Sequence, residues 1–209
     1  MAENSFVPSR TSEAHMNSSR WSMICVVSAV VIGGVTASPT GSADPTTGSV
    51  VTLQQLLSAP VPALCEHDPP GDLVNGTLPQ QESHRGHVGI ARRYDQPGEP
   101  YKVAFGSLTG ADSIDAAMVT DCSAGGGVPW PETVQLYTAG PTRLGGVDLG
   151  DITHSREVVT DLSISDGVVR VHWLANGPND GECCPSIQMA ADLRWDGLTV
   201  RAENVRRLN

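Results

Sequence analysis

The sequence predicts a β-rich domain, all-β or α+β, in which short antiparallel strands form hairpins, with one short N-terminal helix and disulfide staples. The 209 residues include 22 glycines and 15 prolines, a mix typical of a turn-rich globular protein. Two Asp-Gly dipeptides, at 166–167 and 196–197, each lie between runs of alternating hydrophobicity, which is a strong hairpin signal. Four cysteines follow an apolar N-terminal segment, as in exported domains.

The first hairpin can be tested for register. A two-residue loop at 166–167 places one set of apolar residues on a single face and a polar set on the other. The expected pairs are Ile164 with Val169, Leu162 with Val171, Thr160 with Trp173, Ser163 with Arg170, and Asp161 with His172.

The second hairpin follows the same logic around residues 196–197. A two-residue loop there predicts that Trp195 lies opposite Leu198, Leu193 opposite Val200, Ala191 opposite Ala202, and Asp192 opposite Arg201. The last pair would be an opposite-charge contact on the solvent face, worth about 0.2–1 kcal/mol.

Elsewhere the chain shows one helix signal and several short strands. Leu53, Leu56 and Leu57 recur at helical spacing behind Thr52, a good N-cap, and Pro60 closes the segment. Alternating or apolar runs predict further strands at about 101–105, 116–122, 133–138 and 146–149.

The N-terminal region is expected to direct export. Residues 21–37 carry no charge, follow Arg10 and Arg20, and end in the small residues that a signal peptidase reads. We therefore expect residues 1–37 to be an export signal cleaved after Ala37; an uncleaved signal anchor is the alternative. Residues 38–49 form a Ser/Thr/Pro/Gly-rich linker, and residues 50–209 a single extracytoplasmic domain, secreted or tethered to the membrane.

The net charge of −10 constrains the partners. An acidic surface repels phosphate backbones and anionic lipid, so nucleic-acid binding is not expected. Contact with a membrane is expected only through the N-terminal hydrophobic segment, and no cofactor is expected.

Cys65, Cys122, Cys183 and Cys184 form an even set, and disulfides are the expected state in an oxidising compartment. Three connectivities are possible. A direct bond between the adjacent cysteines is the least favoured, because it closes a small strained ring; the other two would pin the N-terminal region to the C-terminal sheet. Zinc held by these thiols with His154 or His172 is the alternative, although no C-x-x-C pair is present.

No catalytic motif marks a nucleophile. The chain lacks G-x-S-x-G, H-E-x-x-H and phosphate-binding glycine loops. Trp130, between Pro129 and Pro131, is a candidate contact for a ligand or partner, or a lid over one end of the sheet. Asp161 and His172, expected to face each other, are further candidate contacts and could orient each other as an acid and a base.

Residues 107–119, SLTGADSIDAAMV, resemble a degenerate copy of the calcium-binding FG-GAP-type repeat, D-x-x-G-D-G-x-x-D-x-x-V. Gly110 and Asp115 keep the expected identities, whereas Ser107 and Ala111 replace aspartates and Asp112 replaces a glycine. The resemblance makes Asp112 and Asp115 weak calcium candidates.

A longer stretch, about 56–198, resembles an uncharacterised family of secreted or membrane-tethered proteins of high-GC Gram-positive bacteria. The motifs that carry the resemblance are LCEHDPPGDLVNGTLP at 64–79, DCSAGGGVPWPETVQLY at 121–137, LGGVDLGD at 144–151 and ECCP at 182–185. The resemblance implies an extracytoplasmic location and disulfide bonds, and it names no substrate.

Together these observations predict a non-catalytic binding or structural module of the cell envelope. One alternative is a secreted or envelope-tethered hydrolase whose site is built from loops and includes His154 or His172. The other is a calcium-dependent binding domain.

Overall fold

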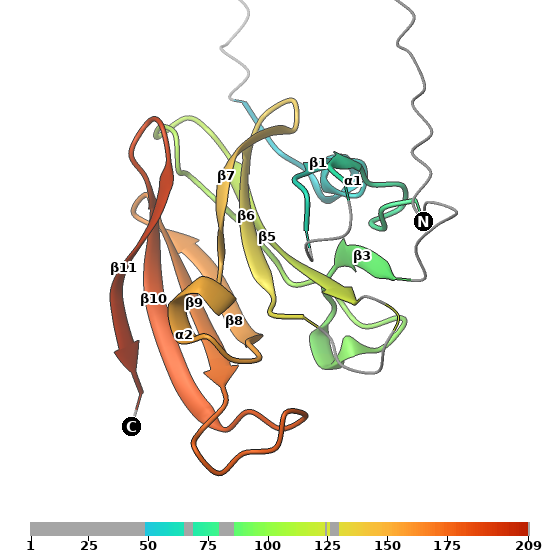
Figure 1. Cartoon of the computed structure of the whole chain (residues 1–209). Coiled ribbons are helices and arrows are strands. Elements are labelled where there is room, and N and C mark those ends of the chain that lie inside the picture. Colours follow the sequence, from blue (N-terminus) through green and yellow to red (C-terminus); the bar gives the residue numbers. More distant parts are fainter. Residues whose placement is uncertain (1–48, 65–68, 80–85, 124, 126–129, 209) are drawn as a thin grey trace, which may run out of the picture. The chain divides into compact units, whose positions relative to one another are not determined.

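A computed structural model describes residues 49–64, 69–79, 86–123, 125 and 130–208 (Figure 1). The predicted export segment, residues 38–48 of the predicted linker, Cys65 and Pro129 lie outside these residues. The elements, in chain order, are α1 (Leu53–Leu56), β1 (Pro60–Val61), β2 (Gly71–Asp72), β3 (His87–Ile90), the 3-10 helix η1 (Arg93–Asp95), β4 (Val103–Gly106), β5 (Asp115–Ser123), β6 (Thr133–Thr138), β7 (Thr142–Asp148), α2 (Gly150–Thr153), β8 (Val158–Ser165), β9 (Val168–Ala175), β10 (Ile187–Trp195) and β11 (Val200–Arg207).

Two antiparallel sheets dominate the domain, which confirms the predicted β-rich class (Figure 1). The C-terminal sheet has the strand order β11-β10-β9-β8, so each strand neighbours the next along the chain. The other sheet has the order β3-β5-β6-β7, and β4 also pairs with β5, beyond the end of β3. A small β1-β2 pair completes the described strands.

Strand β5 contributes side chains to two separate apolar cores, because its side chains alternate between the two faces of the sheet. Ala117 and Val119 pack into a core shared with β6, β8, β9 and β10. Ala116 and Met118 point the other way, into a core shared with buried residues from 51–64 and with Leu73. The sheet of β3 to β7 is therefore the middle layer of the domain. The C-terminal sheet packs on one face, and the N-terminal segment that begins at Val51, called here the N-terminal wrap, packs on the other.

The N-terminal wrap begins with the predicted helix. Thr52 caps α1: its hydroxyl accepts from the Gln55 N–H at 3.3 Å, while the Gln55 side chain accepts from the Thr52 N–H at 2.9 Å. This reciprocal capping box satisfies two amide donors that the first turn leaves open. The Tyr137 hydroxyl on β6 donates to the Pro60 carbonyl at 2.7 Å and joins the wrap to the middle sheet.

The first hairpin confirms most of the predicted register. Four of the pairs predicted for β8 and β9 are present, including Asp161 opposite His172. Asp166 and Gly167 both have positive φ, 56° and 72°, as a two-residue type I′ turn requires. The predicted pair of Thr160 with Trp173 is wrong: a bulge lies between Val159 and Asp161, so Val159 takes that place.

The second hairpin is shifted by two residues from its prediction. Trp195 lies opposite Val200, not Leu198, and the connection is four residues long. The Asp196 side chain explains the longer loop, because its Oδ1 accepts from the N–H groups of Leu198 (2.9 Å) and Thr199 (2.8 Å). A shift of two preserves the faces, so Ala191 and Leu193 are buried as predicted. The inward position predicted for Leu198 is wrong, because this residue lies in the longer loop and is 85% exposed.

The shift also changes the charge pairs on the outer face. Asp192 lies opposite Glu203, and the predicted pair of Asp192 with Arg201 is wrong. Arg201 instead forms an ion pair with Asp196, with Nε and Oδ2 3.2 Å apart.

The expected cross-linking of the C-terminal cysteines to the rest of the chain is also wrong. Cys183 and Cys184 are bonded to each other. Cys122 is disulfide-bonded as well, and its partner lies outside the described residues. The layers explain the difference: Cys122 is buried in the core behind the middle sheet, whereas Cys183 and Cys184 are exposed in the β9–β10 loop.

Within the described residues, no helix is both long and apolar enough to span a membrane. The helices that the structure describes are single turns, and the domain is built on its strands.

Candidate functional site

A pocket of about 640 Å³ opens where three chain segments meet at one end of the sheets. The segments are the approach to β6, the turn between α2 and β8, and the loop between β9 and β10, which projects beyond the strand ends in Figure 1. The pocket is lined by Trp130, Pro131, His154, Ser155, Arg156, Asn176, Asp180 and Glu182.

Trp130 brings the predicted aromatic contact to this pocket. The backbone N–H of Trp130 donates to the Cys122 carbonyl at 3.0 Å. The side chain of Trp130 is half-buried and packs against the N-terminal core. Pro131 then passes close to α2: a Cβ on Gly150 would lie 2.8 Å from the Pro131 ring, so glycine is needed there. The aromatic residue is thus fixed to the body of the domain.

The first wall of the pocket is the α2–β8 turn, residues 154–156. His154 ends α2 with a left-handed backbone (φ 51°), and its N–H donates to the Gly150 carbonyl at 2.9 Å. The turn is held from beneath by Glu157, which is 1% exposed. Glu157 Oε1 accepts from the Thr153 hydroxyl (2.5 Å), the Ser155 N–H (2.9 Å) and the Ser155 hydroxyl (2.9 Å).

This carboxylate belongs to a wider buried network. The Thr153 hydroxyl also accepts from the indole N–H of the core residue Trp173 at 3.2 Å. Asp148, close to Glu157, has its pKa raised by burial and by repulsion from Asp151 and Glu157. The first wall is therefore continuous with the core of the domain.

A buried ion pair stabilises the chain next to the pocket residue Pro131. Lys102 Nζ lies 2.6 Å from Glu132 Oε1, and both side chains are less than a tenth exposed. The other carboxylate oxygen of Glu132 accepts from the Val159 N–H at 2.5 Å. Glu132 thus links the segment before β4 to β8, directly after the pocket residue Pro131.

The second wall is the β9–β10 loop, residues 176–186. Asp180 Oδ2 accepts from the Gly177 N–H (2.7 Å), the Ser186 N–H (2.9 Å) and the Ser186 hydroxyl (2.7 Å). The Gly177 N–H, followed by the Ser186 groups, lowers the pKa of Asp180. Unlike Glu157, Asp180 is partly exposed, so water can reach the groups that hold the loop.

Three hydrogen bonds join the two walls. The Arg156 N–H donates to Asn176 Oδ1 at 3.1 Å, and the Asn176 N–H donates to the Ser155 hydroxyl at 3.1 Å. The Arg156 guanidinium donates from Nη1 to the Glu182 carbonyl at 3.1 Å. Asn176 and Arg156 therefore fix the spacing of the walls.

The pocket carries charged side chains of both signs. His154 and Arg156 come from the first wall, and Asp180 and Glu182 come from the second. Among the residues that the structure describes, no ion pair joins these four side chains. The pocket thus offers hydrogen-bond donors, hydrogen-bond acceptors and charged groups beside an aromatic residue. This arrangement suits a ligand with several polar groups.

Ser155 and His154 line the pocket together, an arrangement that favours the hydrolase alternative. The Ser155 hydroxyl, however, donates to Glu157 and accepts from the Asn176 N–H. In the described part of the chain, no hydrogen bond joins it to His154. The hydroxyl is used to hold the two walls, and its acceptor is a buried carboxylate oxygen that also accepts from the Thr153 hydroxyl and the Ser155 N–H.

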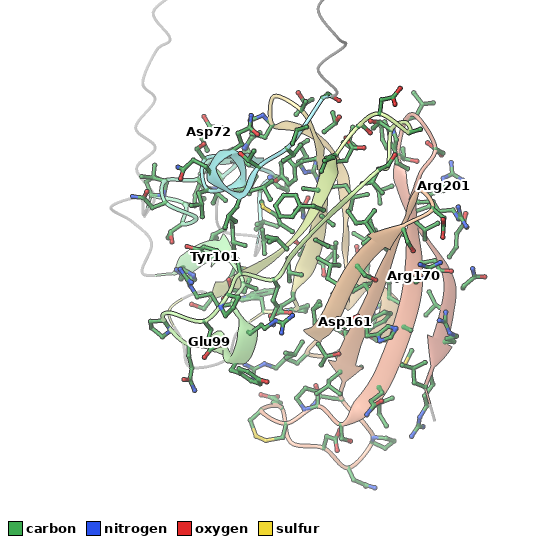
Figure 2. The ribbon with its side chains drawn as sticks, turned by 180° about the vertical axis from the view of Figure 1, so that it is seen from behind. Asp72, Glu99, Tyr101, Asp161, Arg170 and Arg201 are labelled. Atoms are coloured by element: carbon green, nitrogen blue, oxygen red, sulfur yellow. A yellow bond between two sulfur atoms is a disulfide. The ribbon has the colours of Figure 1, made fainter. Side chains whose placement is uncertain are left out.

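Asp161 and His172 lie outside this pocket. They face each other on β8 and β9 as predicted, but no hydrogen bond or ion pair between their side chains is found among the described residues. Asp161 lines a different pocket, of about 520 Å³, with Tyr94 and Tyr101; all but Tyr94 are labelled in Figure 2. Their role as ligand or partner contacts stays a prediction.

The calcium candidates do not converge. Asp112 is exposed, whereas Asp115 is buried and its Oδ2 accepts from the N–H groups of Leu108 and Thr109, both at 2.7 Å. Burial opposes ionisation of Asp115, but hydrogen bonds from the Thr138 side chain and these backbone groups lower its pKa overall. No group of three or more His, Cys, Asp or Glu side chains placed to hold a metal ion is found in the described ranges.

Sequence reasoning named Trp130 and His154 but missed most of the pocket. The missed residues are Ser155, Arg156, Asn176, Asp180 and Glu182. One signal was available: residues 176–182, NGPNDGE, form a polar loop between two predicted strands, and such loops often carry function. The contribution of the α2–β8 turn had no comparable signal.

No family model, curated protein or solved structure matches the chain in comparisons with known proteins. The resemblances drawn from the sequence motifs stay predictions.

Proposed function

We propose that the protein is an exported, non-catalytic module of the cell envelope that binds a polar ligand in the Trp130 pocket. The observation that carries this proposal is the pocket itself, where an anchored tryptophan faces two walls bearing charged and polar side chains. Clefts that combine an aromatic surface with a few placed polar groups are the usual form of a small-ligand site.

Binding is favoured over hydrolysis by the use made of Ser155. Its hydroxyl is engaged on both sides by Glu157 and by the Asn176 N–H, so it serves as a link between the walls. The same contacts suit a rigid binding site.

The ligand that fits best is a neutral saccharide. Sugar rings pack their C–H faces on aromatic side chains, and their hydroxyls donate and accept together, which matches carboxylates and guanidinium groups on opposite walls. Charges of both signs in one pocket suit a neutral polar ligand better than a simple ion of either sign. A volume of about 640 Å³ lies in the range of small-molecule sites.

The export part of the proposal rests on residues 21–37 and on the positive residues before them. N-terminal sequencing of the protein isolated from its native host tests it directly. A mature terminus at Ser38, in the medium or the envelope fraction, supports the proposal, and an intact N-terminus on a cytosolic protein contradicts it.

The binding part is tested by titrating the purified domain with N-acetylglucosamine oligomers and with neutral glucan oligomers while tryptophan fluorescence is recorded. We expect saturable binding, weakened about tenfold or more by Trp130→Ala, since an aromatic anchor commonly carries 1–2 kcal/mol. Glu182→Ala removes an exposed carboxylate with little effect on folding, and should weaken binding about 3- to 10-fold.

The matched control is Ser163→Ala, an exposed change on β8 outside the pocket, which should leave affinity unchanged. Equal affinity in the parent, Trp130→Ala and Glu182→Ala proteins would place the ligand elsewhere. Absence of binding to every saccharide class would reject the ligand assignment.

A further inference from the structure

The β9–β10 loop carries a disulfide between neighbouring residues. Cys183 is bonded to Cys184, both are exposed, and the bond is visible in yellow in the loop of Figure 2. The Cys184 N–H donates to the Gly181 carbonyl at 3.0 Å, so residues 181–184 form a tight turn. The disulfide joins the last two residues of this turn. Two side chains and one peptide unit form a small ring, which restricts the backbone between the two cysteines.

The same turn supplies the carbonyl groups that hold the pocket together. The Gly181 carbonyl accepts from the Asn176 amide at 2.8 Å, and the Glu182 carbonyl accepts from the Arg156 guanidinium at 3.1 Å. Glu182 also lines the pocket. The disulfide therefore restrains the residues that fix the spacing between the two walls.

We propose that the Cys183–Cys184 bond is a redox-sensitive control on the pocket, in which reduction by a dithiol loosens the second wall and weakens ligand binding. This inference rests on the proposed function for its effect on affinity. Its structural part, a change at Arg156 and Asn176 on reduction, does not.

The chemistry needs only a dithiol reductant. One thiolate of the reductant attacks a cysteine sulfur, the bond between Cys183 and Cys184 breaks, and a mixed disulfide forms. The second thiol of the reductant then displaces the remaining cysteine. The protein takes up two electrons and two protons and ends with two thiols, while the reductant ends as a disulfide.

Accessibility makes this bond the first to react. Exchange requires a thiolate to reach a sulfur, and both sulfurs of the pair belong to exposed residues. Cys122 is only 4% exposed and lies in the N-terminal core. A mild dithiol should therefore open the loop disulfide while the bond of Cys122 persists.

Reduction should act on the pocket through the turn. With the ring open, the backbone at Cys183 and Cys184 regains conformations that the disulfide excludes. The Gly181 and Glu182 carbonyls then sample positions in which they no longer accept from Asn176 and Arg156. We expect ligand affinity to fall about 3- to 10-fold, as for the loss of part of one hydrogen bond.

The test is an amide-detected NMR titration of the purified domain with a dithiol, without ligand, in which intact mass counts the thiols. We expect two thiols to appear first, together with shifts at 181–185 and at Arg156 and Asn176. The Cys183→Ser/Cys184→Ser variant should resemble the reduced protein before reductant is added and should not change further under the same mild conditions. That second result separates the loop bond from the bond of Cys122.

Saccharide titrations of both forms complete the test. Weaker binding by the reduced protein and by the double-serine variant supports the inference. Reduction that shifts only 181–185 and leaves Arg156 and Asn176 unchanged overturns it, and so does equal affinity in the two forms. If no saccharide binds in either form, the proposed function fails, while the NMR result still decides whether the bond controls the walls.

Discussion

The two walls of the Trp130 pocket are both held by a carboxylate that accepts three hydrogen bonds, but in opposite environments. Glu157 is buried beneath the α2–β8 turn and tied to the core through Thr153 and Trp173. Asp180 is partly exposed, and the groups from which it accepts belong to its own β9–β10 loop. The first wall is therefore held by a buried group and should be rigid. The second wall is held by a partly exposed group and should move more easily.

This difference in burial predicts how each wall responds when its carboxylate is removed. Loss of a buried acceptor leaves polar donors without a partner where water cannot easily replace it, so the whole domain should respond. Loss of a solvated acceptor is compensated by water, so only the loop should respond.

The largest effect is expected for Glu157→Ala. Removing the carboxylate leaves the hydroxyls of Thr153 and Ser155 and one backbone N–H without their acceptor, at a cost of about 2–3 kcal/mol. Urea denaturation measures this free energy of unfolding. Glu157→Gln retains an acceptor oxygen and should recover part of the loss; a change within about 0.5 kcal/mol for the alanine variant would show that the first wall is not part of the core.

A smaller and local effect is expected for Asp180→Ala. Hydrogen exchange of the amides at 181–186 should become faster, and saccharide affinity should fall, while the melting temperature stays nearly unchanged. Asp196→Ala is the matched control, since Asp196 also accepts from loop N–H groups and has a lowered pKa but lies in the β10–β11 loop. A large drop in melting temperature for Asp180→Ala would contradict the contrast between the walls.

The pH dependence of the second wall follows from the same group. Because the folded pKa of Asp180 is lowered, its hydrogen bonds stabilise the loop above the unfolded pKa and are lost as the pH falls through the folded value. Exchange at 181–186 should therefore accelerate on acidification in the parent protein and be less pH-dependent in Asp180→Ala, after correction for intrinsic exchange rates.

The two Asp-Gly turns show how far the sequence predicts the fold. Both dipeptides mark a hairpin, and both hairpins form. At 166–167 both residues take positive φ and the two-residue loop follows. At 196–197 the Asp196 side chain binds two backbone N–H groups, and the loop lengthens by two residues. Hydrophobic alternation predicts which face is buried, whereas side-chain hydrogen bonds within the turn decide the register.

The pocket was less predictable than the fold. Trp130 was recognisable from its local sequence, because an aromatic residue between prolines is unusual. Glu157 carries no such mark, since its role depends on the burial of a turn between a one-turn helix and β8. Adjacent cysteines predict disulfides, but their pairing depended on which layer of the domain each one reached.

The most direct test of the central claim, that the Trp130 pocket is the ligand site, is an NMR map of amide and indole signals during saccharide titration. We predict that shifts concentrate at the Trp130 indole and at residues 154–156 and 176–182, on both walls. Shifts confined to the outer face around Asp161 and His172, with the Trp130 signal unmoved, would contradict the account.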